Sequence, residues 1–320
     1  MREVNTHNKM LPKVSVIILN WNTTLITCDL LLSLKKHLTY SNVEIIIVDN
    51  GSAKDPSSDF KSIFSDLKII LNAENYGFSA GCNIGMKQAS GDYFLFLNSD
   101  TEITSGIIEK LLEAFSIDHN AGIVSPLVFS YFNKTQIEYA GYNQLHPITG
   151  RARAITSSIS KLSWSNSLAE THYAYGAAMM ISRKIYEEVG GLHEAYFAYY
   201  EELDWSNRIR EKGYKIYCNK EAIVYHKGSM STSSDTPFKT FLLTRNRLLY
   251  MKRNSFGIQY HLFLSYYLLV AAPKNLISYL FSLEFKHCLA YLNALLFHLS
   301  GRTQYFFKTT DEKLVLIKSS

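Results

Sequence analysis

The sequence predicts an α/β protein built on a doubly wound, mostly parallel sheet. Short apolar segments rich in β-branched residues alternate with segments of helical periodicity from residue 14 to about residue 130. This alternation is typical of parallel sheets whose two faces are covered by helices. Several expected strands end directly in polar residues, as strands do at the ligand-binding edge of such sheets. The dinucleotide fingerprint GxGxxG is absent, so a dinucleotide site is not indicated.

A strand, a helix and a second strand are expected near the N-terminus. Residues 14–19 and 43–48 are β-branched and apolar, and leucines between them recur at helical spacing. The first strand ends in Asn20-Trp21-Asn22 and the second in Asp49-Asn50-Gly51-Ser52. A helix end and a short strand over residues 63–71 follow. They open into the segment 75–85, which contains Asn75 and Asn83.

Three glycines in this segment, Gly77, Gly81 and Gly85, are spaced four residues apart. On a helix, that spacing places them along one face, where the absence of side chains permits close approach. Either a neighbouring backbone or a bound ligand can occupy the space. The sequence leaves packing and ligand contact equally open.

An apolar run ends in a carboxylate in the segment GDYFLFLNSDTE, residues 91–102. Residues 94–97 suit a strand covered on both faces, and Asn98, Ser99 and Asp100 follow without a break. A carboxylate at the C-terminal end of a strand can hold a divalent cation against a nucleotide diphosphate. The alternative is a strand-to-helix turn in which Ser99, Asp100 or Thr101 caps the helix.

The middle of the chain is expected to contain a helix over residues 107–115 and a strand over residues 123–129. Residues 144–167 show little periodicity and predict a long mobile loop near a site opening. Its basic residues, Arg151, Arg153 and Lys161, either meet phosphates or are solvated, and solvation is favoured. Order returns over residues 173–181, where Gly176 leaves room for another group.

A second acidic centre lies in the segment AYFAYYEELDWSNRIR, residues 195–210. Glu201, Glu202 and Asp204 fall in the first turn of an expected helix, where the helix dipole alone favours acidic residues. Asp204 and Arg208 have the spacing of a helical ion pair. Glu202 has no such partner and is the freer carboxylate.

Two short strands, residues 215–218 and 222–225, are expected next, and the second ends at His226. A histidine at a strand end is usually structural. Its position before the segment KGSMSTSSD also suits a ligand beside a flexible lid.

The C-terminal part differs in kind. Residues 238–253 contain Arg245, Arg247, Lys252 and Arg253 among apolar positions, and residues 262–283 are apolar but broken by Pro273-Lys274. The break disfavours a membrane-spanning helix. Either a helix pair lying on an anionic inner leaflet or a hairpin packed on the catalytic domain is expected.

Composition excludes some classes of protein. A formal charge of +5 on 320 residues is too small for sustained binding of nucleic acid. The four cysteines are far apart and form no CxxC pair, which fits a reducing cytoplasm and indicates neither a zinc cluster nor a disulfide framework. The first 13 residues are polar and lack the apolar core of a signal peptide.

Six motifs in order, VSVIILNWN, VDNGS, NYGFSAGCNIG, GDYFLFLNSDT, YYEELDWSNRIREKGY and VYH, resemble the inverting glycosyltransferases of family 2, especially the rhamnosyltransferase-like branch. The resemblance implies a GT-A fold over residues 14–236, with a nucleotide-binding half (14–102) and an acceptor-binding half (103–236). A tail (1–13) precedes it, and a helical, membrane-interfacial region (237–303) and a second tail (304–320) follow.

The resemblance also implies the site. Asp49 matches the residue that meets the nucleotide base, and the backbone from Leu19 to Asn22 completes that pocket. Asn98-Ser99-Asp100 stands in place of the DxD motif, so Asp100, helped by His226, would hold Mg²⁺ or Mn²⁺. Glu202 stands where the family has its catalytic base, usually Asp, with Asp204 in reserve. The expected nucleotide-sugar-binding residues are Asn20, Asn22, Asp49, Gly51, Asn75, Gly77, Asn83, Asn98, Ser99 and Gly176.

The implied reaction is a single displacement in which Glu202 removes a proton from the acceptor hydroxyl. The expected donor is a nucleotide sugar, first dTDP-L-rhamnose and then UDP-hexoses, and the expected acceptor is a glycan, lipid-linked, of cell-surface polysaccharide synthesis. A cytoplasmic protein peripheral to the membrane is expected. The alternatives are a sugar nucleotidyltransferase and a non-catalytic, membrane-associated nucleotide-sugar-binding protein.

Overall fold

The computed structural model describes residues 11–156, 164, 167–228 and 236–299, together with the backbone of two strands at 306–310 and 313–317. Several expectations therefore lie outside the described residues. They concern the N-terminal tail up to residue 10, Lys161, residues 229–235 of the expected lid, and most of the C-terminal tail.

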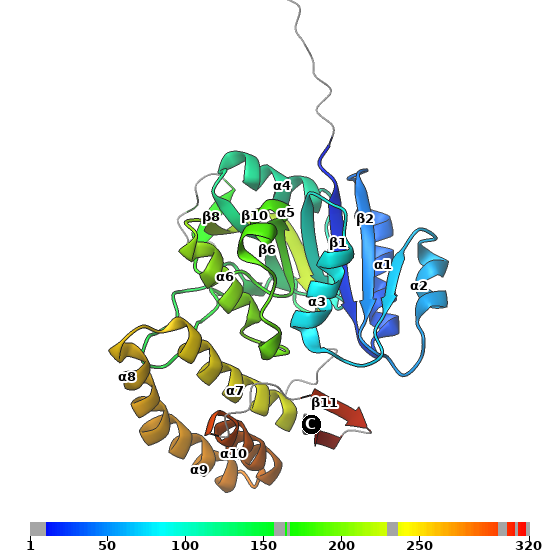
Figure 1. Ribbon diagram of the computed structural model, residues 1–320. Helices are drawn as coiled ribbons and strands as arrows, with labels where there is room; N and C mark the ends of the chain where they lie inside the picture. Colours follow the sequence, from blue (N-terminus) through cyan, green and yellow to red (C-terminus); the bar gives the residue numbers. More distant parts are fainter. Residues whose placement is uncertain are drawn as a thin grey trace, which may run out of the picture.

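One sheet with the strand order β3-β2-β1-β4-β9-β6-β10-β5 organises the molecule (Figure 1). Its first four strands are parallel: β1 (Val14–Asn20), β2 (Val43–Asp49), β3 (Lys68–Leu71) and β4 (Tyr93–Asn98). The pairing of β1 with β2 ends at Asn20 opposite Asp49. The polar ends of the two strands are therefore level at one edge of the sheet.

The second half of the sheet is mixed. The strand β9 (Ala178–Ser182) runs antiparallel between β4 and β6 (Ala121–Ser130), and β10 (Lys215–His226) is parallel to β6. Three short strands complete it antiparallel to their neighbours: β5 (Thr101–Ile103) and β8 (Leu168–Thr171) on β10, and β7 (Ile137–Tyr139) on β6. The predicted, mostly parallel sheet is thus found, with its antiparallel strands confined to this half.

Two predicted elements are wrong in detail. The two short strands expected at 215–218 and 222–225 are one strand, β10, whose register with β6 shifts between Asn219 and Ile223. The polar residues in the middle look like a turn in sequence, but here they form an irregularity at which β10 changes partner from β8 to β5. The segment expected to be ordered over residues 173–181 is described throughout, and its strand, β9, begins at Ala178.

The expected mobile loop at 144–167 is also wrong where the structure describes it. The backbone of residues 140–155 folds back on itself, and Asn143 donates to the carbonyl of Arg153 at 3.0 Å. Side chains from elsewhere fix its tip: Arg247 donates to the carbonyl of Thr149, and Tyr200 to that of Gly150. Arg151 and Arg153 are exposed, in agreement with the solvated interpretation.

Helices cover both faces of the sheet, as a doubly wound fold requires. One face packs on α1 (Thr24–His37), α2 (Ser57–Ile63) and α4 (Ile107–Ile117), and the other on α3 (Gly77–Gln88), α5 (Arg183–Val189) and α6 (Glu201–Glu211). Alternation along β1 supplies both cores: Val16 and Ile18 belong to the first, and Ile17 to the second.

The glycine face of α3 packs against protein. A β-carbon at Gly85 would lie 2.6 Å from Cγ2 of Ile17, and one at Gly81 would meet the side chain of Leu19. A β-carbon at Gly77 would lie 2.6 Å from the ring of Phe197. The glycines therefore let α3 sit directly on β1, which supports the packing role that the spacing left open.

The C-terminal helices form a separate layer beneath the sheet (Figure 1). They are α7 (Pro237–Asn254), α8 (Ile258–Tyr266), α9 (Ala272–Phe281) and α10 (Phe285–Leu299), and a two-stranded ribbon, β11 (Phe306–Thr310) and β12 (Lys313–Ile317), follows. Aromatic residues of α7 and α8 share a core cluster with Leu145, Tyr173 and Leu203. The helices thus pack on the domain.

The break expected at Pro273-Lys274 is wrong. A π turn, Tyr267–Ala271, links α8 to α9 without leaving helical conformation, and the proline lies in the first turn of α9. Proline removes one backbone donor, and the wider turn before it accommodates that loss. No helix in the described part of the chain has both the length and the apolar character to cross a bilayer.

Candidate active site

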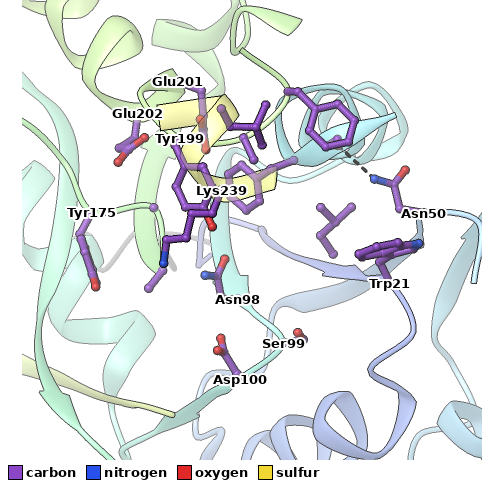
Figure 2. Close-up of a pocket in the computed structure, with 18 of the residues that line it drawn as sticks. Trp21, Asn50, Asn98, Ser99, Asp100, Tyr175, Tyr199, Glu201, Glu202 and Lys239 are labelled. Carbon is purple, nitrogen blue, oxygen red and sulfur yellow. Dashed lines mark hydrogen bonds between the residues drawn. The ribbon is translucent and has the colours of Figure 1, made fainter. Parts of the chain in front are cut away.

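A cavity of about 410 Å³ opens where β1 and β4 end, below α6 and beside the start of α7 (Figure 2). It brings together both acidic centres, which are a hundred residues apart in the sequence. Asp100 and His226 line it on one side, and Glu201 and Glu202 line it on the other. Of the predicted nucleotide-sugar-binding residues, it is also lined by Asn75, Gly77, Asn98, Ser99 and Gly176.

Asp100 lies in a tight turn between two strands. The turn joins β4 to β5, and Thr101 closes it by donating from Oγ1 to the carbonyl of Asn98 at 2.7 Å. The next helix, α4, begins at Ile107. The alternative that Ser99, Asp100 or Thr101 caps a helix is therefore wrong. The turn instead leaves the carboxylate of Asp100 at the strand edge.

The pairing of β5 with β10 brings His226 to Asp100, because Thr101 is opposite His226 in that register. The Nε2 atom of His226 lies 3.3 Å from Oδ1 of Asp100, and Nδ1 lies 2.8 Å from Oε2 of Glu138. Burial alone would lower the pKa of this imidazole. The hydrogen bonds and charges of the two carboxylates outweigh burial and raise the pKa of His226 to about 9.

Glu201 and Glu202 begin α6; Glu201 is buried, and Glu202 is half-buried in the cavity wall. In the described part of the chain, the Oε2 atom of each is buried without a hydrogen-bond partner. Burial raises the pKa of Glu202 to about 7. Burial and then the charge of Glu202 raise the pKa of Glu201 well above its ordinary value. Both carboxyl groups therefore stay protonated to a higher pH than an exposed glutamate does, and they titrate as a coupled pair.

A strained loop positions the two glutamates. Phe197, Tyr199 and Tyr200 all have positive φ angles, of 64°, 72° and 75°, which residues with large side chains rarely adopt. Asn246 of α7 is fully buried, and its Nδ2 group lies 2.9, 2.7 and 2.7 Å from the carbonyls of Tyr196, Ala198 and Tyr199. These bonds offset the strain where the chain turns into α6.

Arg245 supports the same loop. Its guanidinium donates to the carbonyls of Ala195 and Tyr196 at 2.9 and 2.7 Å, and its side chain is buried. Arg247 is buried too, on the carbonyl of Thr149. The sequence interpretation of these arginines as part of a basic surface is therefore wrong.

Asp204 lies on the far side of α6 from the cavity wall and is fully engaged. Arg208 and Arg253 contact its carboxylate at 3.0 and 3.2 Å, and Tyr196 donates to it at 3.0 Å. Burial would raise the pKa of Asp204, but the arginines and the amide of Asn254 stabilise the carboxylate and hold the pKa below its ordinary value. The predicted ion pair between Asp204 and Arg208 is confirmed.

The ends of β1 and β2 form a polar network behind the cavity. Asn20 donates to Asp49 at 2.6 Å, and Ser52 donates to Asp49 from both its amide and its hydroxyl. Asn22 accepts from the amide of Ala53 at 2.9 Å. Gly51 has a φ angle of 75° and lies against the backbone of Glu74. These residues shape the strand ends, and their role toward a nucleotide stays a prediction.

Two of the remaining predicted residues differ in position. Asn75 lines the cavity and accepts from Asn50 at 2.8 Å. Asn83 faces away, because it exchanges hydrogen bonds with the backbone of Leu192 at 2.8 and 2.9 Å. Asn83 therefore fastens α3 to the loop that precedes α6.

Several cavity residues were not singled out from the sequence, and among them are Trp21, Asn50, Tyr199 and Lys239. In Figure 2, Trp21 and Asn50 lie at one end, and the ammonium group of Lys239 points between the two acidic centres. Trp21 directly follows a strand, and that position was a usable signal. Lys239 lies in the first turn of α7, far from every recognised motif, so the sequence offered none.

The comparisons with known proteins agree with this geometry. The model of glycosyl transferase family 2 matches residues 15–190. The low-salt glycan biosynthesis hexosyltransferase Agl10 of Haloferax volcanii is 27% identical over 254 residues, which are 75% of this chain and 76% of that protein. The N-acetylglucosaminyl-diphospho-decaprenol L-rhamnosyltransferase of Mycobacterium tuberculosis is 22% identical over 213 residues, which are 60% of this chain and 69% of that protein.

A solved structure shows the same fold. The mannosyltransferase PcManGT of Pyrobaculum calidifontis, in complex with GDP-Man and Mn²⁺, has a TM-score of 0.55 at 14% identity and covers 92% of this chain and 77% of its own. The predicted GT-A fold is confirmed.

Replacement of Asn246 by alanine should lower the free energy of unfolding by about 2–4 kcal/mol, because the carbonyls of Ala198 and Tyr199 lose this donor and that of Tyr196 loses one of its donors. Urea denaturation measures this change. The matched control is Lys252→Ala, an exposed position of the same helix, for which a change within about 0.5 kcal/mol is expected. Equal urea midpoints for Asn246→Ala and wild type would show that Asn246 does not hold the loop.

Proposed function

Because the chain belongs to glycosyl transferase family 2, we propose that it transfers a sugar from a nucleotide sugar to a glycan hydroxyl, with inversion at the anomeric carbon. One observation carries the proposal: a single cavity has Asp100 and His226 on one side and, on the other, Glu201 and Glu202, whose Oε2 atoms have no hydrogen-bond partner among the described residues. An in-line displacement needs these two kinds of group on opposite sides of one sugar.

Asp100 and His226 fit a divalent cation, Mg²⁺ or Mn²⁺. Their facing atoms are 3.3 Å apart at the cavity wall. Within the described residues, no group of three or more His, Cys, Asp or Glu side chains could hold a metal. Phosphate oxygens and water would complete the coordination, as is usual for Mg²⁺. When bound, the cation supplies Lewis-acid stabilisation of the charge on the departing diphosphate.

Glu202 is the proposed base. Its carboxylate takes the proton of the acceptor hydroxyl, the oxygen bonds to the anomeric carbon, and the bond from that carbon to the diphosphate breaks. The nucleoside diphosphate leaves with the electron pair. A pKa of about 7 suits this role, because a base works best when it titrates near the working pH. Asp204, the reserve candidate, already neutralises two arginines.

Other cavity residues suit the donor. Trp21 offers an aromatic face at the end of β1, near Asn50 and the network around Asp49. Lys239 points toward Asn98 between the acidic centres, where its charge would offset a diphosphate (Figure 2). We assign the nucleotide base of the donor to the end of the cavity at Trp21, and the sugar of the donor to the space beneath Glu202.

The proposed donor is dTDP-L-rhamnose, with UDP-hexoses as the alternative, and the proposed acceptor is a lipid-linked glycan of cell-surface polysaccharide synthesis. The relative named as an L-rhamnosyltransferase supports the first, and its diphospho-decaprenol substrate supports the second. The hexosyltransferase named for glycan biosynthesis supports the wider class.

Two other functions make different products. A sugar nucleotidyltransferase would release pyrophosphate from a nucleoside triphosphate, whereas a transferase releases a nucleoside diphosphate. A non-catalytic binding protein would release neither. The unpartnered carboxylates favour the transferase, because a protein that only binds a nucleotide sugar has no need of a base opposite the cation.

The C-terminal helices are proposed to lie on the anionic inner leaflet of the cell membrane. On the α8, π turn and α9 segment, exposed apolar residues recur at intervals of one or two helical turns, opposite the buried Phe263 and Tyr267: Ile258, Leu262, Leu269, Ile277 and Leu280. From α7 to α10 the only acidic residue is Glu284, while Lys252, Lys274 and Lys286 are exposed. An apolar stripe flanked by lysines fits anionic lipid.

Replacement of Glu202 by glutamine should lower the rate of transfer by ~10²–10⁴-fold, since the amide cannot accept the proton. Release of nucleoside diphosphate measures it, and binding of nucleotide should persist. In the wild type, kcat/KM should rise with pH through about 7, because only the ionised Glu202 acts.

The matched control is Glu211→Gln, an exposed glutamate at the end of the same helix, which should retain the wild-type rate. Near-normal transfer by Glu202→Gln would exclude this residue as the base. Release of pyrophosphate in place of diphosphate would instead favour the nucleotidyltransferase.

Removal of the cation site should remove the metal-dependent part of nucleotide binding. With Mn²⁺, one of UDP, GDP or dTDP should raise the melting temperature of the wild type, because a ligand that binds only the folded state stabilises it. EDTA, or Asp100→Ala, should abolish this shift, and Asp66→Ala, an exposed surface change, should not. Equal protection with and without EDTA would argue against the cation.

Binding to phosphatidylcholine vesicles that contain phosphatidylglycerol should weaken by about tenfold or more in the double variant Leu269→Asp and Phe281→Asp, since both side chains are exposed and apolar. Vesicle sedimentation measures it. Phe132→Asp, a change of a 74% exposed phenylalanine near β7, should bind like the wild type. Self-association of the wild type without vesicle binding would assign the stripe to a second copy.

A further inference from the structure

Glu138 is a half-buried residue that contacts His226, and no sequence motif identified it. Its Oε2 atom lies 2.8 Å from Nδ1 of His226, while the other ring nitrogen, Nε2, faces Asp100. Glu138 itself is not among the residues that line the cavity. It therefore contacts the cavity wall from behind, through the imidazole ring.

The place of the short strand β7 in the sheet fixes the contact between Glu138 and His226. It pairs with β6, which in turn pairs with β10, the strand that ends in His226. Ile137 and Tyr139 on either side of Glu138 pack into the larger core cluster, and Tyr139 donates to the carbonyl of Tyr173 at 2.9 Å. Alternation along the strand turns Glu138 away from that core, toward the histidine.

The chemistry of imidazole determines which ring nitrogen of His226 is available to a cation. A neutral imidazole carries one N–H, and the nitrogen that binds a cation must have a free lone pair. A carboxylate on Nδ1 keeps the hydrogen on that nitrogen, so Nε2 is left to bind on the side of Asp100. Carboxylates that orient metal-binding histidines in this way also make the ring more basic as a ligand.

We propose that Glu138 is a positioning residue that holds His226 as a cation ligand, with Nε2 presented beside Asp100. The inference rests on the proposed cation-dependent function. It adds a third residue on which cation affinity depends, from the strand β7, none of whose residues lines the cavity.

The nearby charges do not offer an equivalent contact. Glu102, two residues from Asp100, is paired with Lys134 at 3.7 Å, and Lys227, next to His226, is paired with Asp29 at 2.6 Å. Tyr175 meets the edge of the His226 ring, 6.1 Å between centroids. Glu138 alone among these side chains is within hydrogen-bond distance of Nδ1.

The test measures the binding of Mn²⁺ to the full chain in the absence of nucleotide. Free Mn²⁺, followed by its EPR signal, gives the affinity of the wild type, Glu138→Ala, Glu138→Gln and His226→Ala. We expect Glu138→Ala to bind Mn²⁺ 10- to 100-fold more weakly, with Glu138→Gln between it and the wild type. The matched control, Glu102→Gln, removes a negative charge two residues from Asp100 that is paired with Lys134 rather than with His226, and should change the affinity less than threefold.

Pulsed EPR adds a readout that a merely structural role would not move. Coupling of Mn²⁺ to an imidazole nitrogen is expected in the wild type, absent in His226→Ala and diminished in Glu138→Ala, at unchanged melting temperature. Wild-type affinity and nitrogen coupling in Glu138→Ala would overturn the role of Glu138 and leave the proposed function standing. Failure of the wild type to bind Mn²⁺ would overturn His226 as a cation ligand and with it the role of Glu138, whereas release of nucleoside diphosphate tests the proposed transfer separately.

Discussion

The site depends on holding two adjacent carboxyl groups at the start of one helix, with little exposure to water. Glu201 is buried and Glu202 is half-buried, and the Oε2 atom of each lacks a hydrogen-bond partner in the described part of the chain, which is costly. The chain reaches this position only through a loop with three bulky residues at positive φ. The amide of Asn246 and the guanidinium of Arg245 bind the carbonyls of that loop. The helix α7 therefore holds the loop that leads to Glu201 and Glu202.

The carboxyl groups on the two sides of the cavity are stabilised in different ways. On the Glu202 side, burial keeps protons on the acids until near neutrality, so the pair does not repel itself. On the Asp100 side, His226 lies between two carboxylates and compensates their charge. A site arranged in this way can separate proton removal from charge stabilisation, which one displacement reaction needs at the same time.

The sequence predicted the strand ends well because their signals are local. Asp100 and His226 each follow an apolar run, and Glu202 begins a helix whose ion pair has a fixed spacing, so each could be recognised within a few residues. Glu138 lies on a strand of three residues, too short to show periodicity. Arg245 and Arg247 look like surface charges in sequence, because nothing local shows that a guanidinium is buried on distant carbonyls. The fold at 140–155 was missed for the same reason.

The π turn at residues 267–271 fixes the orientation of the last part of the molecule. Each residue of a regular α-helix advances the direction of a side chain by about 100°. The wider turn takes up one additional residue, and it therefore sets the direction in which the exposed Ile277 and Leu280 of α9 follow the exposed Ile258 and Leu262 of α8. Loss of one residue there would rotate α9 by about 100° relative to α8. The exposed apolar side chains of α9 would then turn away from their present direction, relative to the aromatic core cluster around Phe263 and Tyr267.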